Sequence, residues 1–182
     1  MYVCENQSYK HHLIESITKK QNERNRLLHI FPTPTNNYYE RGIAMAKALG
    51  DNTVLFDKKI IFKGFASAVG KKEGQGPLRD EFDIVGRDDR FGQKSFERAE
   101  SQLQRMAVLA ALKKAGYRPQ DIDCIFAGDL LNQCIGSSFG IKDLYIPFVG
   151  LYGACSTMAL SLINASIYLE SGAMNRVIAV TS

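Results

Sequence analysis

The stretch Leu151-Tyr152-Gly153-Ala154-Cys155-Ser156-Thr157-Met158 joins an apolar run to a helical segment that carries no charge before Glu170. Its single cysteine stands at the expected start of the helix, where unpaired backbone N–H groups and the helix dipole favour a thiolate. Gly153 and Ala154 keep the turn small, so another molecule can approach the sulfur closely. Cys155 is therefore a candidate nucleophile. On spacing alone, a cysteine that only fills space in the core is an equally good interpretation.

Helical and strand patterns alternate on both sides of this turn. We expect strands over 122–127, 146–152 and 176–181, and helices over 95–115 and 156–169. The second helix is apolar on nearly every side, which predicts burial at the centre of the fold. Strands that alternate with helices indicate an α/β fold with a parallel or mixed sheet and right-handed crossovers.

The helix expected over 95–115 has clear ends. Ser95 is a suitable N-cap, and Gly116 follows the last turn as a C-terminal cap. The spacing predicts one amphipathic stripe along this helix, made of Phe96, Ala99, Leu103, Met106 and Ala110.

The first third of the chain has weaker patterns. Residues 1–50 are expected to be a poorly folded extension, unrelated to the rest or disordered, with a short helix over 39–49 that ends at Gly50. Residues 54–62 predict one or two strands around Asp57-Lys58-Lys59, in a hairpin-like pattern. The glycine-rich stretch 64–92 predicts a long loop, either functional or a surface excursion.

Composition excludes several functional classes. The four cysteines, at 4, 124, 134 and 155, show no CxxC spacing, so we expect reduced thiols, no metal site and no cofactor. The three histidines lie at 11, 12 and 29, away from the later cysteines. Basic residues exceed acidic ones mainly in residues 1–50, with seven Lys and Arg against four Glu. Since aromatic and basic residues are not interleaved, we expect no nucleic-acid partner.

A membrane span is the main rival interpretation of the motif region. Leu144–Leu169 contains no charged residue and is long enough to cross a bilayer. However, Pro147, Gly150 and Gly153 suit a strand followed by a turn and a helix, and would leave backbone groups without partners in lipid. We therefore expect no transmembrane segment.

Four segments carry a resemblance to known proteins. Gly-Ala-Cys-Ser-Thr, at 153–157, resembles the nucleophile segment of the thiolase-like superfamily, which includes thiolases and β-ketoacyl synthases. Together with 70–78, 127–133 and 146–148, it resembles the stage V sporulation protein AD family of spore-forming bacteria. The resemblance covers about residues 52–182 and does not reach residues 1–50.

The resemblance implies a fold and a division of the chain. Thiolase-like proteins consist of two similar α/β halves in layers around buried helices. Residues 51–182 would form the first half, truncated, with its mixed sheet and buried central helix. In the superfamily the second half supplies the histidine or second cysteine that moves protons, and no histidine follows residue 29 here.

The resemblance also implies a function. It predicts a sporulation protein that binds dipicolinic acid, possibly with calcium, in the spore membrane channel complex for dipicolinate and calcium uptake. We expect it to lie peripherally on the cytoplasmic side of the forespore or spore inner membrane. Its expected partners are other channel proteins and either a further copy or a missing second half.

The expected ligand site combines the motif turn with the loop after the preceding strand. Its residues are Asp129, Asn132, Gln133, Cys155, Ser156 and Thr157. Asp129 would repel a carboxylate unless bridged by calcium or paired, and a role as a loop cap is equally open. The alternative function is a thiolase-like or β-ketoacyl-synthase-like acyltransferase that uses Cys155 as nucleophile.

Overall fold

The computed structural model describes residues 1–6 and 46–182, apart from the side chains of Asn6 and Asn132. The chain divides into two compact units. One contains Met1–Glu5 and Ile60–Ser182, and the other contains Asn6–Lys59.

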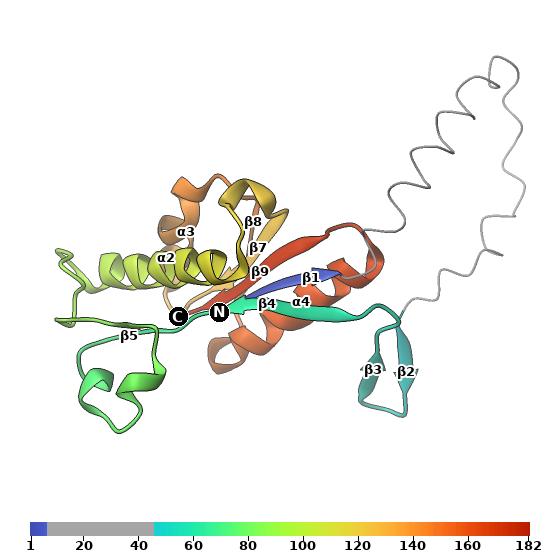
Figure 1. Ribbon diagram of the computed structural model, residues 1–182, viewed down its shortest axis with the longest axis horizontal. Coiled ribbons are helices and arrows are strands. Elements are labelled where there is room, and N and C mark those ends of the chain that lie inside the picture. Colours follow the sequence, from blue (N-terminus) through green and yellow to red (C-terminus); the bar gives the residue numbers. More distant parts are fainter. Residues whose placement is uncertain (7–45) are drawn as a thin grey trace, which may run out of the picture. The chain divides into compact units, whose positions relative to one another are not determined.

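The larger unit is built on a five-stranded mixed sheet in the order β4-β1-β9-β7-β8 (Figure 1). Strands β7, β8 and β9 are parallel to one another, whereas β1 pairs antiparallel with β9. The strand bounds are β1 Tyr2–Asn6, β4 Ile60–Phe65, β7 Cys124–Gly128, β8 Phe148–Gly150 and β9 Arg176–Thr181. The expected mixed α/β fold is confirmed.

Helices cover both faces of this sheet. Successive side chains of a strand point to opposite faces, and β7 places apolar side chains on both. Ile125 and Ala127 of β7 pack with α2 (Phe96–Ala115), while Phe126 packs with α4 (Thr157–Ser171). The short α3 (Ile135–Ile141) lies beside α2 (Figure 1). The result is a sheet between α2 with α3 on one side and α4 on the other.

The ends of α2 are as the sequence predicts, but its buried face is not. The Ser95 hydroxyl accepts a hydrogen bond from the Arg98 N–H, and Gly116 adopts a left-handed conformation. The predicted stripe is wrong, since Phe96 is exposed and Leu103, Met106 and Ala110 are only partly buried. The buried positions are Ala99, Gln104, Ala107, Val108, Ala111 and Leu112.

Helix α4 is covered on one face only. Thr157, Ser161, Ala165 and Leu169, spaced four residues apart, are buried against the sheet. Ile163, Ile167 and Tyr168 are exposed. The prediction of burial on nearly every side is therefore wrong for this chain, although the outer face is as apolar as that prediction required.

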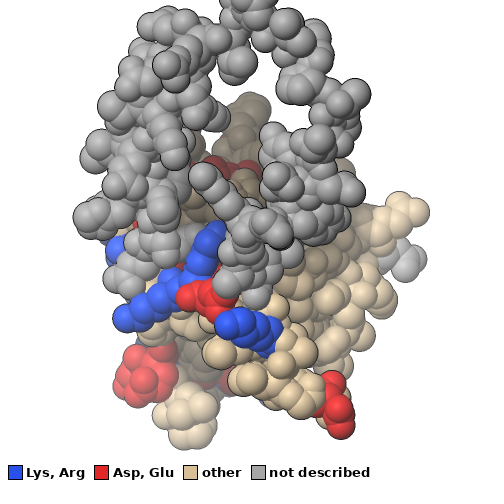
Figure 2. All heavy atoms as spheres, turned by 90° about the vertical axis from the view of Figure 1, so that its right-hand side faces the viewer, with Lys and Arg blue, Asp and Glu red and all other residues tan. Residues whose placement is uncertain are grey.

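The strand β1 joins the sheet from the start of the chain, a region that the sequence assigns to the extension. Val3 and Cys4 are buried within it. Opposite charges gather near its end, where Glu5 pairs with Lys63 and Arg176 and accepts a hydrogen bond from the Tyr117 hydroxyl. Figure 2 shows basic and acidic side chains side by side on the described part of the face it displays, rather than a field of one sign.

The smaller unit contains a hairpin of β2 (Lys47–Leu49) and β3 (Thr53–Leu55). Its turn contains Gly50, which has a φ of 65°. The predicted helix over 39–49 is wrong for 47–49, and its first part lies outside the described residues. Strands are present on both sides of 57–59, as β3 and β4, but they form no hairpin because β3 pairs with β2.

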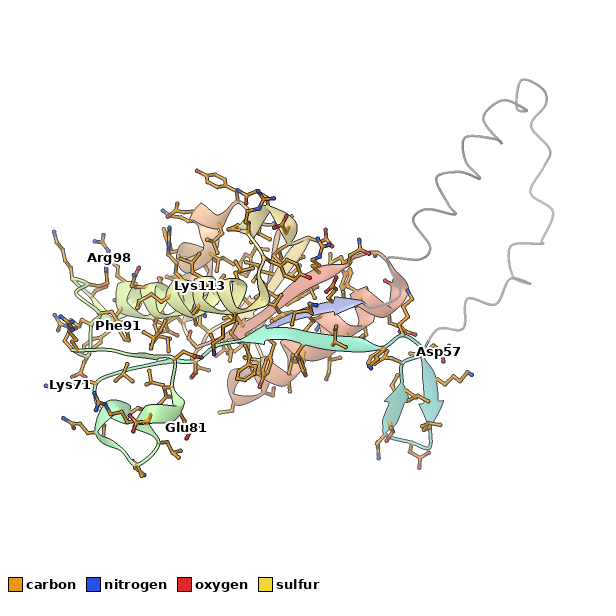
Figure 3. The ribbon with its side chains drawn as sticks, in the orientation of Figure 1. Asp57, Lys71, Glu81, Phe91, Arg98 and Lys113 are labelled. Carbon is orange, nitrogen blue, oxygen red and sulfur yellow. The ribbon has the colours of Figure 1, made fainter. Side chains whose placement is uncertain are left out.

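The glycine-rich stretch after β4 has structure of its own. Strands β5 (Ala68–Val69) and β6 (Ile84–Val85) pair in parallel, with short 3-10 turns at Glu73–Gln75 and Arg79–Glu81 between them. Side chains pack on two of its glycines. Val85 contacts Gly74, and a Cβ at Gly86 would lie 2.8 Å from the ring of Phe91 (labelled in Figure 3). The segment is thus a compact excursion rather than an open loop.

In the part of the chain that the structure describes, no helix combines the length and apolarity that a membrane crossing requires. The uncharged stretch 144–169 is instead divided among a 3-10 turn, β8, a second 3-10 turn and α4.

Candidate functional site

The candidate site lies at the edge of the sheet where its parallel strands end. Strand β7 ends at Gly128, which pairs with Thr181 at the end of β9, and Ala127 pairs with Gly150 at the end of β8. In α/β sheets, ligands bind in the crevice outside the carboxyl ends of the strands. The two predicted segments, 129–133 and 151–157, both leave the sheet at this edge.

The turn that carries Cys155 is a 3-10 turn, Ala154–Ser156, placed directly before α4. Ala154, not Gly153, takes the left-handed conformation, with a φ of 47°. This conformation is uncommon for a residue with a Cβ and costs about 1 kcal/mol or more. Strain of this kind is frequent at functional turns, so Ala154 marks the turn as more than a connection.

Local hydrogen bonds hold this strained turn in place. The Thr157 hydroxyl donates to the Ala154 carbonyl at 2.8 Å and accepts from the Gly153 N–H at 3.2 Å. The Ser156 hydroxyl donates to the Gly153 carbonyl at 2.6 Å. Thr157 is buried and Ser156 is exposed, so Thr157 fixes the turn while Ser156 is open to solvent.

The four cysteines differ sharply in environment. Cys155 is exposed, whereas Cys4, Cys124 and Cys134 are buried. Burial raises the pKa of the Cys4 thiol to about 12 and also raises that of Cys124. The sequence-based alternative of a space-filling Cys155 is therefore wrong, and its sulfur is open to approach.

Gly128 lets the end of β7 approach the turn closely. The Leu151 N–H donates to the Ala127 carbonyl at 2.8 Å, which pins the chain just before the turn. A Cβ at position 128 would lie 2.0 Å from the Leu151 carbonyl oxygen and 2.5 Å from Cγ2 of Thr157. Only glycine fits there without displacing the segment that carries Cys155.

Asp129 is a cap inside the fold. It is fully buried, and its carboxylate accepts hydrogen bonds from the Leu131 N–H at 2.9 Å and the Ser137 N–H at 2.7 Å. It also accepts from the Ser137 hydroxyl at 2.6 Å. Of the two roles that the sequence leaves open, the structure shows the cap, with both carboxylate oxygens bonded to the chain itself.

The loop between Asp129 and α3 is bound to the turn through Cys134. Gln133 and Cys134 are both left-handed, with φ of 58° and 53°. The Cys134 thiol lies 3.5 Å from the Leu151 carbonyl oxygen, as a donor to it. The Gln133 side chain is exposed, and that of Asn132 lies outside what the structure describes.

A buried glutamine that the sequence analysis missed connects these parts. The side-chain N–H₂ of Gln104 lies within hydrogen-bond distance of the Gly128 carbonyl (3.1 Å) and of the hydroxyls of Ser137 (3.0 Å) and Ser182 (2.8 Å). The Ser182 hydroxyl donates to Glu100 at 2.6 Å. The sequence could have revealed this glutamine as a polar residue on the buried face of α2. It did not, because the predicted apolar stripe assigned the buried face to other residues.

The predicted residues thus fall into two groups. Asp129 and Thr157 are buried and stabilise the site, whereas Gln133, Cys155 and Ser156 are exposed at the edge of the sheet. The exposed groups offer an amide, a thiol and a hydroxyl, which suit an anionic ligand or a covalent acyl step. Among residues 1–6 and 46–182, no three His, Cys, Asp or Glu side chains gather as a metal site needs.

Comparison with known proteins finds similarity over the part of the chain that contains both of these segments. The family model described as stage V sporulation protein AD matches residues 50–182. Stage V sporulation protein AD of Bacillus subtilis (strain 168) is 39% identical over 136 residues. That similarity covers 75% of this chain and 40% of the relative, so the chain spans about two-fifths of the relative's length.

Proposed function

The chain belongs to the stage V sporulation protein AD family, and from that membership we propose that it serves sporulation by binding dipicolinic acid. The observation that carries the proposal is the family match over residues 50–182, which includes both the 129–133 loop and the Cys155 turn. Calcium would accompany the ligand as cargo.

The exposed groups suit this ligand chemically. Dipicolinate is a flat aromatic ring with two carboxylates, so it needs hydrogen-bond donors and a floor of small residues. Gln133 offers a side-chain N–H₂, Ser156 a hydroxyl, and the start of α4 backbone N–H groups. Asn132 is a further amide in the proposed set, while Asp129 and Thr157 hold the backbone that presents these donors.

Binding is a better proposal than catalysis. A cysteine that takes and releases an acyl group needs a partner to move protons, and no histidine follows residue 29. Cys124 and Cys134 are buried against backbone carbonyls of Ile125 and Leu151. The exposed Cys155 beside the strained Ala154 is the observation that favours the second candidate, a thiolase-like acyltransferase.

The outer face of α4 supports a proposal about partners. Ile163 and Ile167 are each about half exposed, on a helix whose only charged residue is Glu170. An apolar helix face of this kind is usually covered by another protein surface. We place a second thiolase-like half or a further copy there, and other proteins of the spore membrane channel around the whole, at the cytoplasmic side of the forespore or spore inner membrane.

The spore is where the proposal can be tested. Deleting the gene in the spore former that carries it should sharply lower spore dipicolinate, measured by terbium fluorescence of spore extracts. When the gene is returned to the deletion strain, the double variant Gln133→Ala with Ser156→Ala should leave spore dipicolinate low. The Cys155→Ser variant should restore it. Lys113→Ala, an exposed change on α2, is the matched control (Figure 3). Normal dipicolinate in the deletion strain would rule the proposal out, and failure of Cys155→Ser alone would favour acyl transfer.

A further inference from the structure

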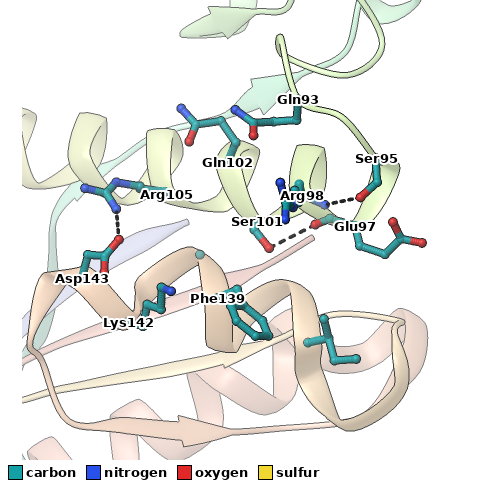
Figure 4. A pocket seen from close by; sticks show the side chains of 12 residues that line it. Gln93, Ser95, Glu97, Arg98, Ser101, Gln102, Arg105, Phe139, Lys142 and Asp143 are labelled. Atoms are coloured by element: carbon teal, nitrogen blue, oxygen red, sulfur yellow. Dashed lines mark hydrogen bonds and ion pairs between the residues drawn. The ribbon is translucent and has the colours of Figure 1, made fainter.

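A groove of about 520 Å³ lies between the first half of α2 and the segment from α3 to Asp143 (Figure 4). None of the six predicted site residues lines it. The helices approach each other at its base, where a Cβ at Gly140 would lie 2.6 Å from the Ser101 carbonyl oxygen. Its volume is within the range typical of small-molecule sites.

The α2 wall presents polar groups in a row. Arg98, Gln102 and Arg105 are four and three residues apart, so they lie on one face of the helix. Arg105 is already paired, because its guanidinium donates to Asp143 at 2.8 Å and closes one end of the groove. The Arg98 guanidinium forms no hydrogen bond or ion pair with any described residue.

The opposite wall is apolar with a cation at its end. Ile135 and Phe139 are 39% and 59% exposed and both line the groove, four residues apart on α3. The Lys142 ammonium lies 5.2 Å from the centre of the Phe139 ring. One wall of the groove therefore carries the Ile135 and Phe139 side chains with Lys142, and the other wall carries Arg98.

The acidic groups at the groove do not cancel this pair of cations. Asp143 is neutralised by Arg105. Glu97 is held by the cap of α2, and the hydrogen bond from Ser95 lowers the pKa of its carboxyl, so it is an anion at the mouth. Two cations, Arg98 and Lys142, thus remain against one carboxylate among the residues that line the groove.

We propose that this groove is a second binding site, for a small organic anion with a carboxylate on an aromatic ring. The planar fork of Arg98 matches a carboxylate with two parallel hydrogen bonds. Phe139 and Ile135 contact the ring, and Lys142 attracts a second carboxylate where one is present. Inorganic phosphate has no apolar ring, so it would make no contact with the wall formed by Ile135 and Phe139.

The test uses the whole 182-residue chain, labelled with ¹⁵N and titrated with isophthalate while amide chemical shifts are recorded. We expect saturable shifts at the amides of Arg98, Phe139 and Lys142. Arg98→Ala should weaken binding about tenfold and Lys142→Ala about threefold, with Lys113→Ala unchanged as the control on the same helix. Arg98 is exposed, so its removal should leave the spectrum of the folded protein otherwise intact.

Three results would overturn this site. They are an absence of shifts at the groove up to about 10 mM isophthalate, equal affinity in Arg98→Ala, and equal shifts with phosphate or with benzyl alcohol. The groove and the proposed function can fail separately. If dipicolinate changed only the amide chemical shifts of Gln133 and Cys155, the proposed function would be supported and the groove would be ruled out as a binding site. Conversely, isophthalate binding at the groove without any spore phenotype would leave the groove standing alone.

Discussion

At the scale of single residues, the edge that carries the candidate site is distinguished by backbone strain and exposure. Three residues with a Cβ, namely Gln133, Cys134 and Ala154, adopt left-handed conformations where the loop and the turn leave the sheet. The sequence predicts Cys155 as a site residue but cannot show which neighbour is strained. Gly153 has a φ of −131°, and its neighbour Ala154 takes the unusual conformation.

We predict that iodoacetamide labels Cys155 at least about tenfold faster than any other described cysteine in the folded protein at pH 8. The reason is exposure, because Cys4, Cys124 and Cys134 are buried and reaction requires an accessible thiolate. Peptide mass spectrometry after a short pulse gives the rates, and labelling in urea provides the control. Comparable labelling of Cys124 or Cys134 would contradict the site geometry.

The pH dependence at Cys4 follows from the same burial. Its pKa in the folded chain is about 12, above the ordinary value, so the fold favours the neutral thiol. That contribution to stability is complete below the unfolded pKa and is lost as pH rises towards 12. Above pH 9 the free energy of unfolding should therefore fall less steeply in Cys4→Val than in the original chain, measured by urea unfolding. Parallel pH profiles would contradict it.

At the scale of elements, sequence reasoning succeeds where the signal is local. The ends of α2 are set by Ser95 and Gly116. The strands β7 and β9 are short apolar runs in the sequence. It fails at α3, since Gly136 and Gly140 weaken the helical pattern and the helix is anchored by Asp129 from outside it. It also fails at β1, because the pairing of Val3 with Ile178 joins the two ends of the sequence.

We predict that Asp129→Asn lowers the free energy of unfolding by about 2–4 kcal/mol. The amide replaces one carboxylate oxygen with a donor, so either the Leu131 N–H or the N–H and hydroxyl of Ser137 lose their acceptor inside the fold. Urea unfolding followed by circular dichroism measures the change.

The matched control for that substitution is Asp143→Asn. It breaks the ion pair with Arg105 on the surface and should cost less than about 1 kcal/mol. Equal losses for the two variants would mean that Asp129 is not the anchor of the loop and α3.

At the scale of the whole molecule, the candidate site occupies one edge of a sheet that is covered on both faces, yet α4 keeps an apolar outer face. Sequence reasoning foresaw an uncharged helix but not its partial exposure, because a hydrophobic pattern reports what a helix can bury and not what is present to cover it. The relative from Bacillus subtilis is longer than the matched region, which leaves room for such a cover in the family.

The part of the Bacillus subtilis relative that lies beyond the matched region can be supplied as a separate chain. We predict that the double variant Ile163→Asn with Ile167→Asn abolishes its association with this chain. Both side chains are exposed, so the stability of the chain alone should change by less than about 1 kcal/mol. Analytical ultracentrifugation measures association, and Leu109→Asn, an exposed apolar site on α2, is the control. Undiminished association in the double variant would place the partner elsewhere.

The central claim is that the edge at Cys155 binds dipicolinate and does not turn over a thioester. Calorimetric titration of the chain, extended by the corresponding remainder of the Bacillus subtilis relative, tests it most directly. We predict a saturable binding event at this edge that is lost in Gln133→Ala with Ser156→Ala and retained in Cys155→Ser and in Arg98→Ala, which removes the separate groove at α2. Absence of dipicolinate binding, together with acyl transfer from a thioester that disappears in Cys155→Ala, would contradict the account.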